Sequence, residues 1–526
     1  MDFHKIKLYY HTIRFLKPFQ VYHRLIGRFK QKTRFIDINQ KFNQSLILWT
    51  GGLKNLSSFD ENSSLNFLNT LKNFNSGEID WNYSSNGKLW TYNLNYFDFL
   101  NQDSMDANQG IKLINQFIEY SPNLIDGVEP YPISLRSINW IKFLSKNKII
   151  NDKINAHLFR DCCFLYNNLE YHILGNHLLE NAFSLLFSSY YFQNEKFYAK
   201  ANLLLKQQLQ EQVLDDGGHF ELSPMYHKII LTRLLDCINL INLNPDFKKN
   251  NLLDFLIKKA ELMCSWLENI TYKSGHVPMV NDTAYGITHS SMEILNYAHS
   301  IGIEKVKTQL SDSGYRMIKR PSYELFLDVG NIGPDYQPGH AHSDTFNFEL
   351  NFKSNPIIVD TGISTYEKNN TRQLERSTFS HNTVMIDNSD QSEVWGGFRV
   401  ARRAKVFDLK SFENKISAKH NGYKRKGIIH KRSFEWFDKE IYIHDFLSKK
   451  SNNKAKAIFH FHSNIKKPVI RLNQIKLNDV GINISFHGST RIQLLEYNLC
   501  EGFNKSEKAY KLVVNFNKEL KTVIFL

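Results

Sequence analysis

The chain has 526 residues, of which 42% are hydrophobic and 13% aromatic. This composition excludes a disordered protein and is sufficient for two or three hydrophobic cores. The formal net charge of +14 favours an acidic partner, whether nucleic acid, anionic lipid or a polyanionic glycan. We expect no transmembrane helix, because the chain lacks a run of about 18 apolar residues, and no disulfide framework, because the five cysteines show no CxxC spacing.

Residues 1–45 form a basic arm in which lysines and arginines alternate with Tyr, Phe, Leu and Ile. The arm lacks the short apolar core and the small-residue cleavage site of a secretory signal, so we expect a cytoplasmic protein. Such a segment suits peripheral contact with an anionic membrane. It equally suits a basic solvated helix that packs on its own domain, and the sequence leaves both interpretations open.

Helical periodicity dominates residues 46–312. Apolar residues recur at three- and four-residue intervals in segments 111–118, 158–174, 177–191, 197–214, 225–243 and 252–270. Short turns rich in Gly, Asn and Asp separate several of these segments. This pattern predicts an all-α domain built from helical hairpins, arranged as a toroid or a solenoid.

After Gly314 the pattern changes to short strands. They are predicted at residues 323–329, 356–359, 383–386, 457–461, 482–486, 511–515 and 522–526. Many short strands without helical runs between them predict a β-sandwich over residues 313–526. Ligands favour domain interfaces, so we expect the polar motifs of the two halves to meet at their junction.

The segment His340-Ala341-His342-Ser343-Asp344, with Asp360 and His381 after it, collects imidazoles and carboxylates within a strand-rich region. His340 and His342 are two residues apart, so in an extended segment their side chains point the same way. Imidazoles grouped with a carboxylate suit a divalent metal site, and a histidine there is suited to proton transfer. The alternative is a polar turn whose histidines cap strands.

Three polar segments of the helical half are candidates to face this motif. Gly175-Asn176-His177 opens an apolar helix, where Asn176 could instead be an N-cap. Ser223-Pro224-Met225-Tyr226-His227 marks a helix start, where Tyr226 could be a core anchor. In the third segment Arg136 and Trp140 suit carboxylate binding and sugar stacking, although a buried Trp at a helix start explains them as well.

Taken together and in order, these motifs, with Asp360-Thr361-Gly362, Arg376-Ser377-Thr378 and His381-Asn382-Thr383, resemble the heparinase II/III-like family of polysaccharide lyases. The resemblance covers roughly residues 80 to 400. It implies an incomplete (α/α) toroid at 46–312 followed by an antiparallel β-sandwich at 313–526, which agrees with the periodicity.

The resemblance also implies roles for individual residues. Asn176 and His177 would bind and neutralise a uronate carboxylate, Tyr226 would be the general acid and often also the base, and His340 would be the partner base. His342, Asp360 and His381 would hold a structural zinc. Substrate contacts are expected from the remaining polar residues of the motifs, Arg136, Trp140, His227 and Arg376.

The reaction that this implies is β-elimination on an acidic, uronic-acid-containing bacterial polysaccharide. A base removes the C5 proton, charge spreads into the neutralised carboxylate, and an acid protonates the departing O4. We expect Arg136 to lower the pKa of Tyr226. The basic arm resembles family members linked to capsule or exopolysaccharide assembly. Two alternatives stay open: a uronate C5-epimerase of the same fold, and a non-catalytic glycan-binding or assembly protein. No nucleic-acid motif accompanies the positive charge.

Overall fold

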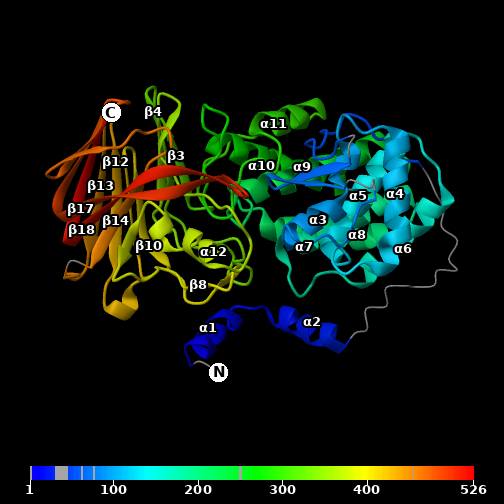
Figure 1. The fold of residues 1–526 in the computed structure, drawn as a ribbon, viewed down its shortest axis with the longest axis horizontal. Helices are drawn as coiled ribbons and strands as arrows, with labels where there is room; N and C mark the ends of the chain where they lie inside the picture. The colour runs from blue at the N-terminus through cyan, green and yellow to red at the C-terminus, as the bar shows by residue number, and fades with distance from the viewer. Residues whose placement is uncertain (1–2, 30–45, 61–62, 75–77, 248–251, 453) are drawn as a thin grey trace.

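The computed structural model describes residues 3–29, 46–60, 63–74, 78–247, 252–452 and 454–526. Along the chain, a two-helix arm is followed by a helical domain and then by a β-domain, which lie beside each other along the longest axis of the molecule (Figure 1). The rest of the predicted arm, residues 30–45, lies outside the described residues.

The helical domain is built largely from helices that pack against the next helix in the sequence. Its helices are α3 (Lys88–Tyr96), α4 (Ala107–Tyr120), α5 (Pro130–Lys146), α6 (Asp152–Asn167), α7 (Gly175–Tyr191), α8 (Glu195–Gln212), α9 (Pro224–Leu243), α10 (Leu252–Ile270) and α11 (Ser291–Ser300). Apolar side chains from all of them form one continuous core. Six of these helices overlap the predicted segments, although α6 ends before the predicted boundary. The domain is not all-α, however, because a hairpin of β1 (Ser64–Phe67) and β2 (Thr70–Asn73) covers one end.

Two helix starts place polar residues at the end of the domain that faces the sheets. Helix α9 begins as predicted, with Pro224 in its first turn and the Ser223 hydroxyl accepting from the Tyr226 N–H at 3.3 Å. Helix α7 begins differently from the N-cap alternative: Leu174 is the capping position, and Asn176 lies inside the first turn. The predicted helix 158–174 ends at Asn167, because the chain turns there to bring Glu170 back toward α7.

The β-domain has two main antiparallel sheets. The smaller has the order β3 (Tyr315–Lys319), β4 (Tyr323–Asp328), β5 (Phe348–Phe352) and β6 (Asn355–Ile358). The main path of the larger is β10 (Val406–Phe412), β11 (Lys415–His420), β12 (His430–Trp436), β13 (Glu440–Leu447), β18 (Lys505–Phe525), β17 (Ile482–Gly502), β16 (Gln474–Leu477) and β15 (Val469–Arg471). Strand β14 (Ala455–His460) joins β18 to β7 (Val384–Ile386). Alternate apolar residues of both sheets share one core, which confirms the predicted sandwich.

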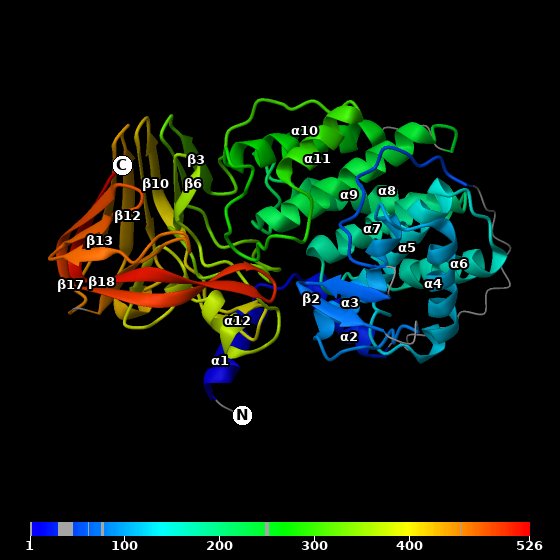
Figure 2. The ribbon, with the colours of Figure 1, turned by 45° about the horizontal axis from the view of Figure 1, so that its top comes forward.

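Three elements of the β-domain reach toward the helices. The hairpin β17–β18 extends from the sandwich to the helical domain (Figure 2), and at its tip the Phe503 carbonyl accepts from Asn69 Nδ2 at 2.9 Å. The short helix α12 (Asn370–Glu375) and the ribbon of β8 (Val394–Trp395) and β9 (Arg399–Val400) lie near the same junction. Together they close one side of the space between the domains.

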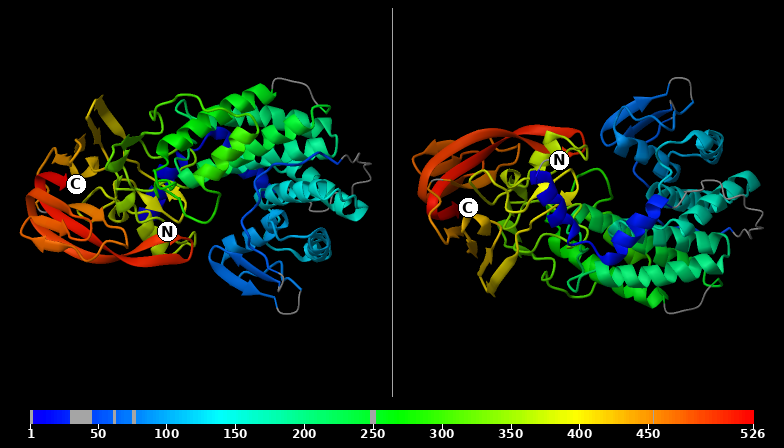
Figure 3. Two further views of the ribbon diagram at one scale, coloured as in Figure 1. Left: turned by 90° about the horizontal axis from the view of Figure 1, so that it is seen from above. Right: turned by 90° about the horizontal axis from the view of Figure 1, so that it is seen from below.

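The arm consists of α1 (Phe3–Ile13) and α2 (Pro18–Phe29) and crosses the underside of the molecule (Figure 3). Helix α1 packs against the ribbon, where the Tyr9 and Trp395 rings lie 4.8 Å apart. Helix α2 packs against the helical domain, where Gln20 Nε2 donates to the Ile173 carbonyl at 3.0 Å. The arm therefore packs on its own molecule and bridges both domains. Within the described residues, no helix combines the length and hydropathy required to cross a membrane.

Candidate active site

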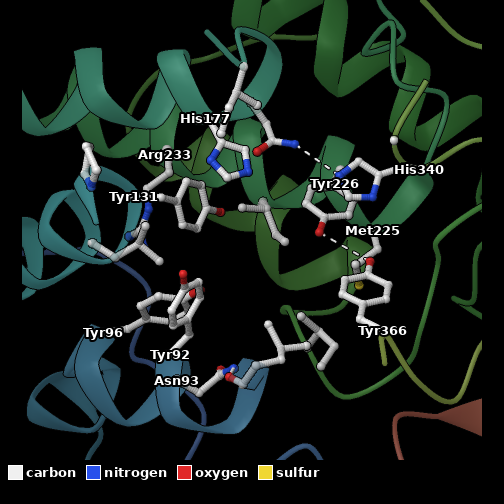
Figure 4. A pocket seen from close by; sticks show the side chains of 18 of the residues that line it. Tyr92, Asn93, Tyr96, Tyr131, His177, Met225, Tyr226, Arg233, His340 and Tyr366 are labelled. Carbon is white, nitrogen blue, oxygen red and sulfur yellow. Dashed lines mark hydrogen bonds between the residues drawn. The ribbon is translucent and has the colours of Figure 1, made fainter. Parts of the chain in front are cut away.

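A cavity of about 1370 Å³ lies where the two domains and the arm meet. Tyr92 and Tyr96 are four residues apart on α3 and so share one face of that helix. They approach the cavity from below, while Tyr131 and His177 line it from the other helices (Figure 4). Tyr226, His340 and Tyr366 lie together on the side toward the sandwich. The arrangement is an aromatic-lined cleft with several titratable side chains directed into it.

His340 is held by the buried carboxylate of Asp282. Its Nδ1 lies 2.9 Å from Asp282 Oδ2, the geometry of a hydrogen bond donated by the ring. A neutral ring with its proton on Nδ1 keeps the lone pair on Nε2. This Nε2 is 3.3 Å from Asn176 Nδ2, which donates to it. The imidazole is therefore orientated by a carboxylate at Nδ1 and by the Asn176 amide at Nε2, and Nε2 can accept a proton where that amide contact is displaced.

Tyr226 lies directly against His340. The two rings are stacked with centroids 3.9 Å apart, and the Tyr226 hydroxyl is 3.3 Å from the Tyr366 hydroxyl. Burial raises the pKa of Tyr226 well above its ordinary value, and the nearby carboxylates of Asp282 and Glu221 add to the increase. This result contradicts the expectation of a lowered tyrosine pKa and keeps the phenol protonated at neutral pH.

Asn176 is positioned by Glu221. Its Nδ2 donates to Glu221 Oε2 at 2.7 Å, and its backbone N–H donates to Glu221 Oε1 at 3.2 Å. The preceding Gly175 has φ +58°, and a Cβ there would lie 2.6 Å from the same Glu221 Oε1. The glycine is thus required for the close approach of Glu221, and the Asn176 amide is already committed to Glu221 and His340.

His177 is a partly exposed member of the predicted catalytic groups. Its Nδ1 is 3.1 Å from Glu170 Oε1, and its ring lies against Tyr131 with centroids 4.6 Å apart. Burial alone would lower its pKa, but the Glu170 carboxylate outweighs burial and the net pKa is raised. His177 therefore retains a positive charge to higher pH than a free imidazole and presents it to the cleft.

Asp282 is the centre of a buried charged cluster that the sequence analysis missed. Besides His340 it accepts from His342 Nε2 at 2.9 Å and from Arg372 NH2 at 2.7 Å. The carboxylate is fully buried, and although burial raises its pKa, Arg372 and the two histidines lower it well below the usual range. The same guanidinium covers the Tyr366 ring at 4.9 Å, so one cluster positions both His340 and Tyr366.

The three predicted zinc ligands lie near one another. The rings of His342 and His381 are 5.3 Å apart, and His381 Nδ1 is 2.7 Å from Asp360 Oδ2. His342 Nδ1 and His381 Nε2 are buried without hydrogen-bond partners, as metal-binding nitrogens would be. Asp360, however, is already bonded to Asn347 and Gly362, and the described residues contain no group of three side chains arranged around a common metal position. Zinc therefore stays a prediction, and no chemical step depends on it.

Arg136 and Trp140 do not line the cleft, contrary to prediction. Arg136 is 3% exposed and forms an ion pair with Asp161 at 2.9 Å on the other side of α5. Trp140 packs in the core between Phe97 and Phe117, which is the alternative that its helical position left open. Since Arg136 is absent from the residues that influence the Tyr226 pKa, its expected effect on that phenol is not supported either.

His227 and Arg376 are likewise buried away from the cleft. The His227 Nδ1 accepts from the His219 N–H and its Nε2 lies 3.0 Å from the Met263 carbonyl, while burial lowers its pKa to about 3. Arg376 donates to the Ala341 carbonyl at 2.9 Å, and so holds the loop between His340 and His342. His227 and Arg376 therefore stabilise the fold around the site and do not contact the cleft where a substrate would bind, contrary to prediction.

The cleft also contains cations that the motifs did not reveal. Its charged lining comprises Arg24, Lys200, Arg233 and Arg399, against the single carboxylate of Asp98 among the lining residues that are described. Asp282 and Arg372 were not predicted as site residues, because neither belongs to a recognisable spacing pattern in the sequence. Glu221, by contrast, lies two residues before the Ser223–His227 motif, so its closeness to Tyr226 in the sequence was the available signal.

Two family models match most of the chain. The heparinase II/III N-terminus matches residues 134–302, and the heparinase II/III-like C-terminal model matches residues 304–524. Their border falls between α11 and β3, where the helical domain gives way to the sandwich. The match therefore covers both domains and the cleft between them.

Individual relatives are more distant. A heparin-sulfate lyase of Bacteroides stercoris is 24% identical over 253 residues, which are 42% of this chain and 37% of that protein. A second, from Pedobacter heparinus, is 24% identical over 259 residues, 43% of this chain and 38% of that protein. The chain thus spans less than two fifths of the length of the curated relatives it matches.

Solved structures share the fold over more of the chain. A crystal structure of heparinase III superposes with a TM-score of 0.65 at 16% identity and covers 85% of this chain and 79% of its own. A mutant heparan sulfate lyase from Pedobacter heparinus has a TM-score of 0.59 at 16% identity, with 96% and 87% covered. The architecture is an incomplete (α/α) toroid followed by an antiparallel β-sandwich, and the chain belongs to the heparinase II/III-like family.

Proposed function

We propose that this protein is a polysaccharide lyase that cleaves an acidic, uronate-containing glycan by β-elimination. The observation that carries the proposal is the stacked pair of Tyr226 and His340, with His340 orientated by Asp282 and both rings facing one cleft. A proton donor and a proton acceptor within one substrate's reach are what removal of the C5 proton and expulsion of O4 require. The heparinase-like fold supports the same reaction class.

The geometry favours separate roles for the two side chains. His340 is the base, because the hydrogen bond from Nδ1 to Asp282 leaves a lone pair on Nε2. In the free protein this lone pair accepts a long contact from Asn176 Nδ2, at 3.3 Å, which the substrate must displace. Tyr226 is the acid, because burial raises its pKa and keeps the hydroxyl protonated, so that it holds a proton to donate and no phenolate is present to act as the base. In this scheme His340 takes the C5 proton, and the Tyr226 hydroxyl protonates the O4 that leaves.

The uronate carboxylate must be neutralised for charge to spread from C5. His177 suits this role, since Glu170 raises its pKa and its ring faces the cavity. Arg233 lines the same wall, but the buried carboxylates of Glu180, at 3.6 Å, and Asp236, at 3.8 Å, balance its charge, so His177 is the stronger candidate. The Asn176 amide is bonded to Glu221 and His340, so we assign it to positioning His340 rather than to holding the carboxylate alone.

The positive balance of the cleft favours a polymer with repeated negative charges. We extend the proposal to an acidic bacterial polysaccharide of capsule or exopolysaccharide type, and to a structural zinc near His342 and His381. Peripheral contact of the basic arm with a membrane is a separate expectation. Its test is co-sedimentation with vesicles containing anionic lipid, compared with neutral vesicles.

The test of the lyase proposal is incubation with a panel of uronate polysaccharides, with the ultraviolet absorbance of the unsaturated product as the readout. We expect absorbance with the wild-type protein and none with Tyr226→Phe. C5 deuterium exchange in D₂O without unsaturated product from the wild-type protein would contradict elimination and indicate an epimerase. Binding without either signal would indicate a non-catalytic glycan-binding protein.

A further inference from the structure

The arm forms part of the cleft as well as bridging the domains. Tyr22, His23 and Arg24 of α2 line the same cavity as Tyr226 and His340. Arg399 of β9, in the ribbon against which α1 packs, lines the same cavity. A segment that precedes both family-matched domains in sequence thus contributes directly to their shared cleft.

Two guanidinium groups of this part of the molecule, those of Arg24 and Arg399, line the same cavity. Arg24 uses its Nε to donate to the His172 carbonyl at 3.1 Å. Arg399 lies over the rings of Trp395, at 4.9 Å, and Tyr9, at 5.5 Å. In the described part of the chain, neither guanidinium makes a hydrogen bond or ion pair with a carboxylate. Both are exposed, so their free N–H groups face solvent or a ligand.

The two charges influence each other. Both side chains line the same cavity, and burial and then the positive charge of Arg399 lower the pKa of Arg24. Like charges held together favour binding of an anion, because an anion removes the repulsion and receives several charge-assisted hydrogen bonds. The aromatic contacts of Arg399 and the backbone contact of Arg24 limit the freedom of both side chains, which lowers the entropy cost of binding.

We propose that Arg24 and Arg399 form a second anion-binding subsite of the cleft, which binds a carboxylate or sulfate of a glycan unit other than the one that reacts. The inference rests on the proposed function, because it assumes that the cleft holds an acidic glycan. It assigns the arm a role in substrate binding. Lys200, which lines the same cavity beside Tyr166, adds a further positive charge along the path of the polymer.

The anchoring of α2 connects this subsite to the catalytic side chains. Its contacts at Ile173 and His172 lie in the loop between α6 and α7. The same loop carries Glu170, the partner of His177. An occupied subsite therefore lies next to the loop that positions the carboxylate-binding histidine, and a long acidic substrate is expected to contact both.

The test measures the binding of di-, tetra- and hexasaccharides by calorimetry, in a Tyr226→Phe background that prevents cleavage. Hyaluronan and alginate fragments supply carboxylates only, and heparan sulfate fragments add sulfates. We expect Arg24→Gln with Arg399→Gln to weaken binding of the longer fragments about 10- to 100-fold, because one or two charge-assisted hydrogen bonds are lost. Disaccharide binding should change little, since the other subsites of the cleft remain.

Controls separate this effect from loss of charge or of structure. Arg14→Gln with Arg471→Gln removes the same charge outside the cleft lining and should leave binding unchanged. Arg24→Lys with Arg399→Lys keeps the charge but loses the planar fork, and should weaken binding less than the glutamine pair. An unchanged thermal midpoint would show that the arm remains docked. A larger loss for heparan sulfate than for alginate would identify sulfate as the bound group.

The outcomes distinguish the two proposals. Cleavage by the wild-type protein, with equal fragment affinity in the glutamine pair, would overturn the subsite and leave the lyase intact. Arginine-dependent binding without cleavage of any polymer would support the subsite and contradict the lyase. Failure of every fragment to bind would overturn the subsite for both kinds of anionic group.

Discussion

On the sandwich side of the cleft, His340 and Tyr366 are held by Asp282 and Arg372, a pair of opposite charges that is almost completely removed from water. On the helical side, His177 is partly exposed and depends on one carboxylate, Glu170. The first wall is rigid because breaking a buried pair is costly. The helical wall carries the positive charge of His177, which is lost as the pH rises through the His177 pKa. We infer that the sandwich side fixes the geometry of proton transfer, whereas the helical side and the arm recognise charge on the substrate.

The largest effect is expected from removal of the proton-transfer pair. Replacing His340 with Gln or Tyr226 with Phe should reduce kcat by about 10²- to 10⁴-fold, the usual contribution of a positioned acid or base. His227→Gln serves as the comparison, because His227 follows Tyr226 in sequence but faces the core. If His227→Gln lowered kcat as much as Tyr226→Phe without loss of stability, the assignment of the site would be wrong.

Asp282→Asn tests the rigid wall. It leaves Arg372 buried without its counter-ion, and we expect a loss of about 3–5 kcal/mol in the free energy of unfolding, together with lower kcat from a misorientated His340. Urea unfolding measures the first effect. Glu119→Gln is the control, because Glu119 pairs with Lys153 and both side chains are exposed, 70% and 53%, and it should cost less than about 1 kcal/mol. Equal losses in the two variants would contradict the buried cluster.

Gly175→Ala tests the close packing behind Asn176. A Cβ at this position would lie 2.6 Å from Glu221 Oε1, so the Glu221–Asn176–His340 contacts must shift and kcat should fall. Gly275 has φ +86° with nothing within 4 Å of the added Cβ, so Gly275→Ala should show only the backbone cost of about 1–2 kcal/mol. Steady-state kinetics and thermal melting on both variants separate the clash from the strain. Normal kcat in Gly175→Ala would show that the Glu221 contact is unimportant.

The helical wall should respond to pH through His177. Its folded pKa is raised by Glu170, so its charge persists to higher pH, and KM for an acidic glycan should increase only as pH rises through that raised value. The stability it contributes is fully present below the unfolded pKa of about 6.5 and is lost as pH rises through the folded pKa. In Glu170→Gln the increase in KM should move to lower pH. An unmoved KM profile would exclude His177 from carboxylate binding.

The smallest functional effect is expected at Arg136. Arg136→Lys disturbs the ion pair with Asp161 and should lower stability, while KM and the pH–rate profile stay as in the wild-type protein. The measurement is a pH–rate profile beside a melting curve. A shift of the profile would restore the role that the sequence motif suggested for this residue.

Local periodicity was sufficient to predict most elements. The segment 252–270 coincides with α10, because its apolar face follows the helical period without interruption. Strand β5, which the predicted strand segments did not include, begins only at Phe348, and residues 339–347 before it form the loop that carries His340 and His342. Both rings nevertheless point to one place, because both bind Asp282.

The remaining part of the site depends on contacts between distant segments. Asp282 lies 58 residues before His340 and 90 before Arg372, and such pairing leaves no periodic signal in the sequence. The predicted substrate contacts of Arg136 and Trp140 were wrong for a related reason. Their residue types suit sugar binding, but the rotation of α5 directs both away from the cleft. Residue type identified candidates, and only the packing of helices against the sandwich decided which of them face the substrate.

The most direct test of the separate roles is C5 hydrogen exchange in D₂O, measured on a cleaved polysaccharide with Tyr226→Phe and His340→Gln. If His340 is the base and Tyr226 the acid, Tyr226→Phe should still exchange the C5 hydrogen while it releases no unsaturated product, and His340→Gln should do neither. Exchange that persists in His340→Gln but disappears in Tyr226→Phe would show that the tyrosine is the base and would contradict this account.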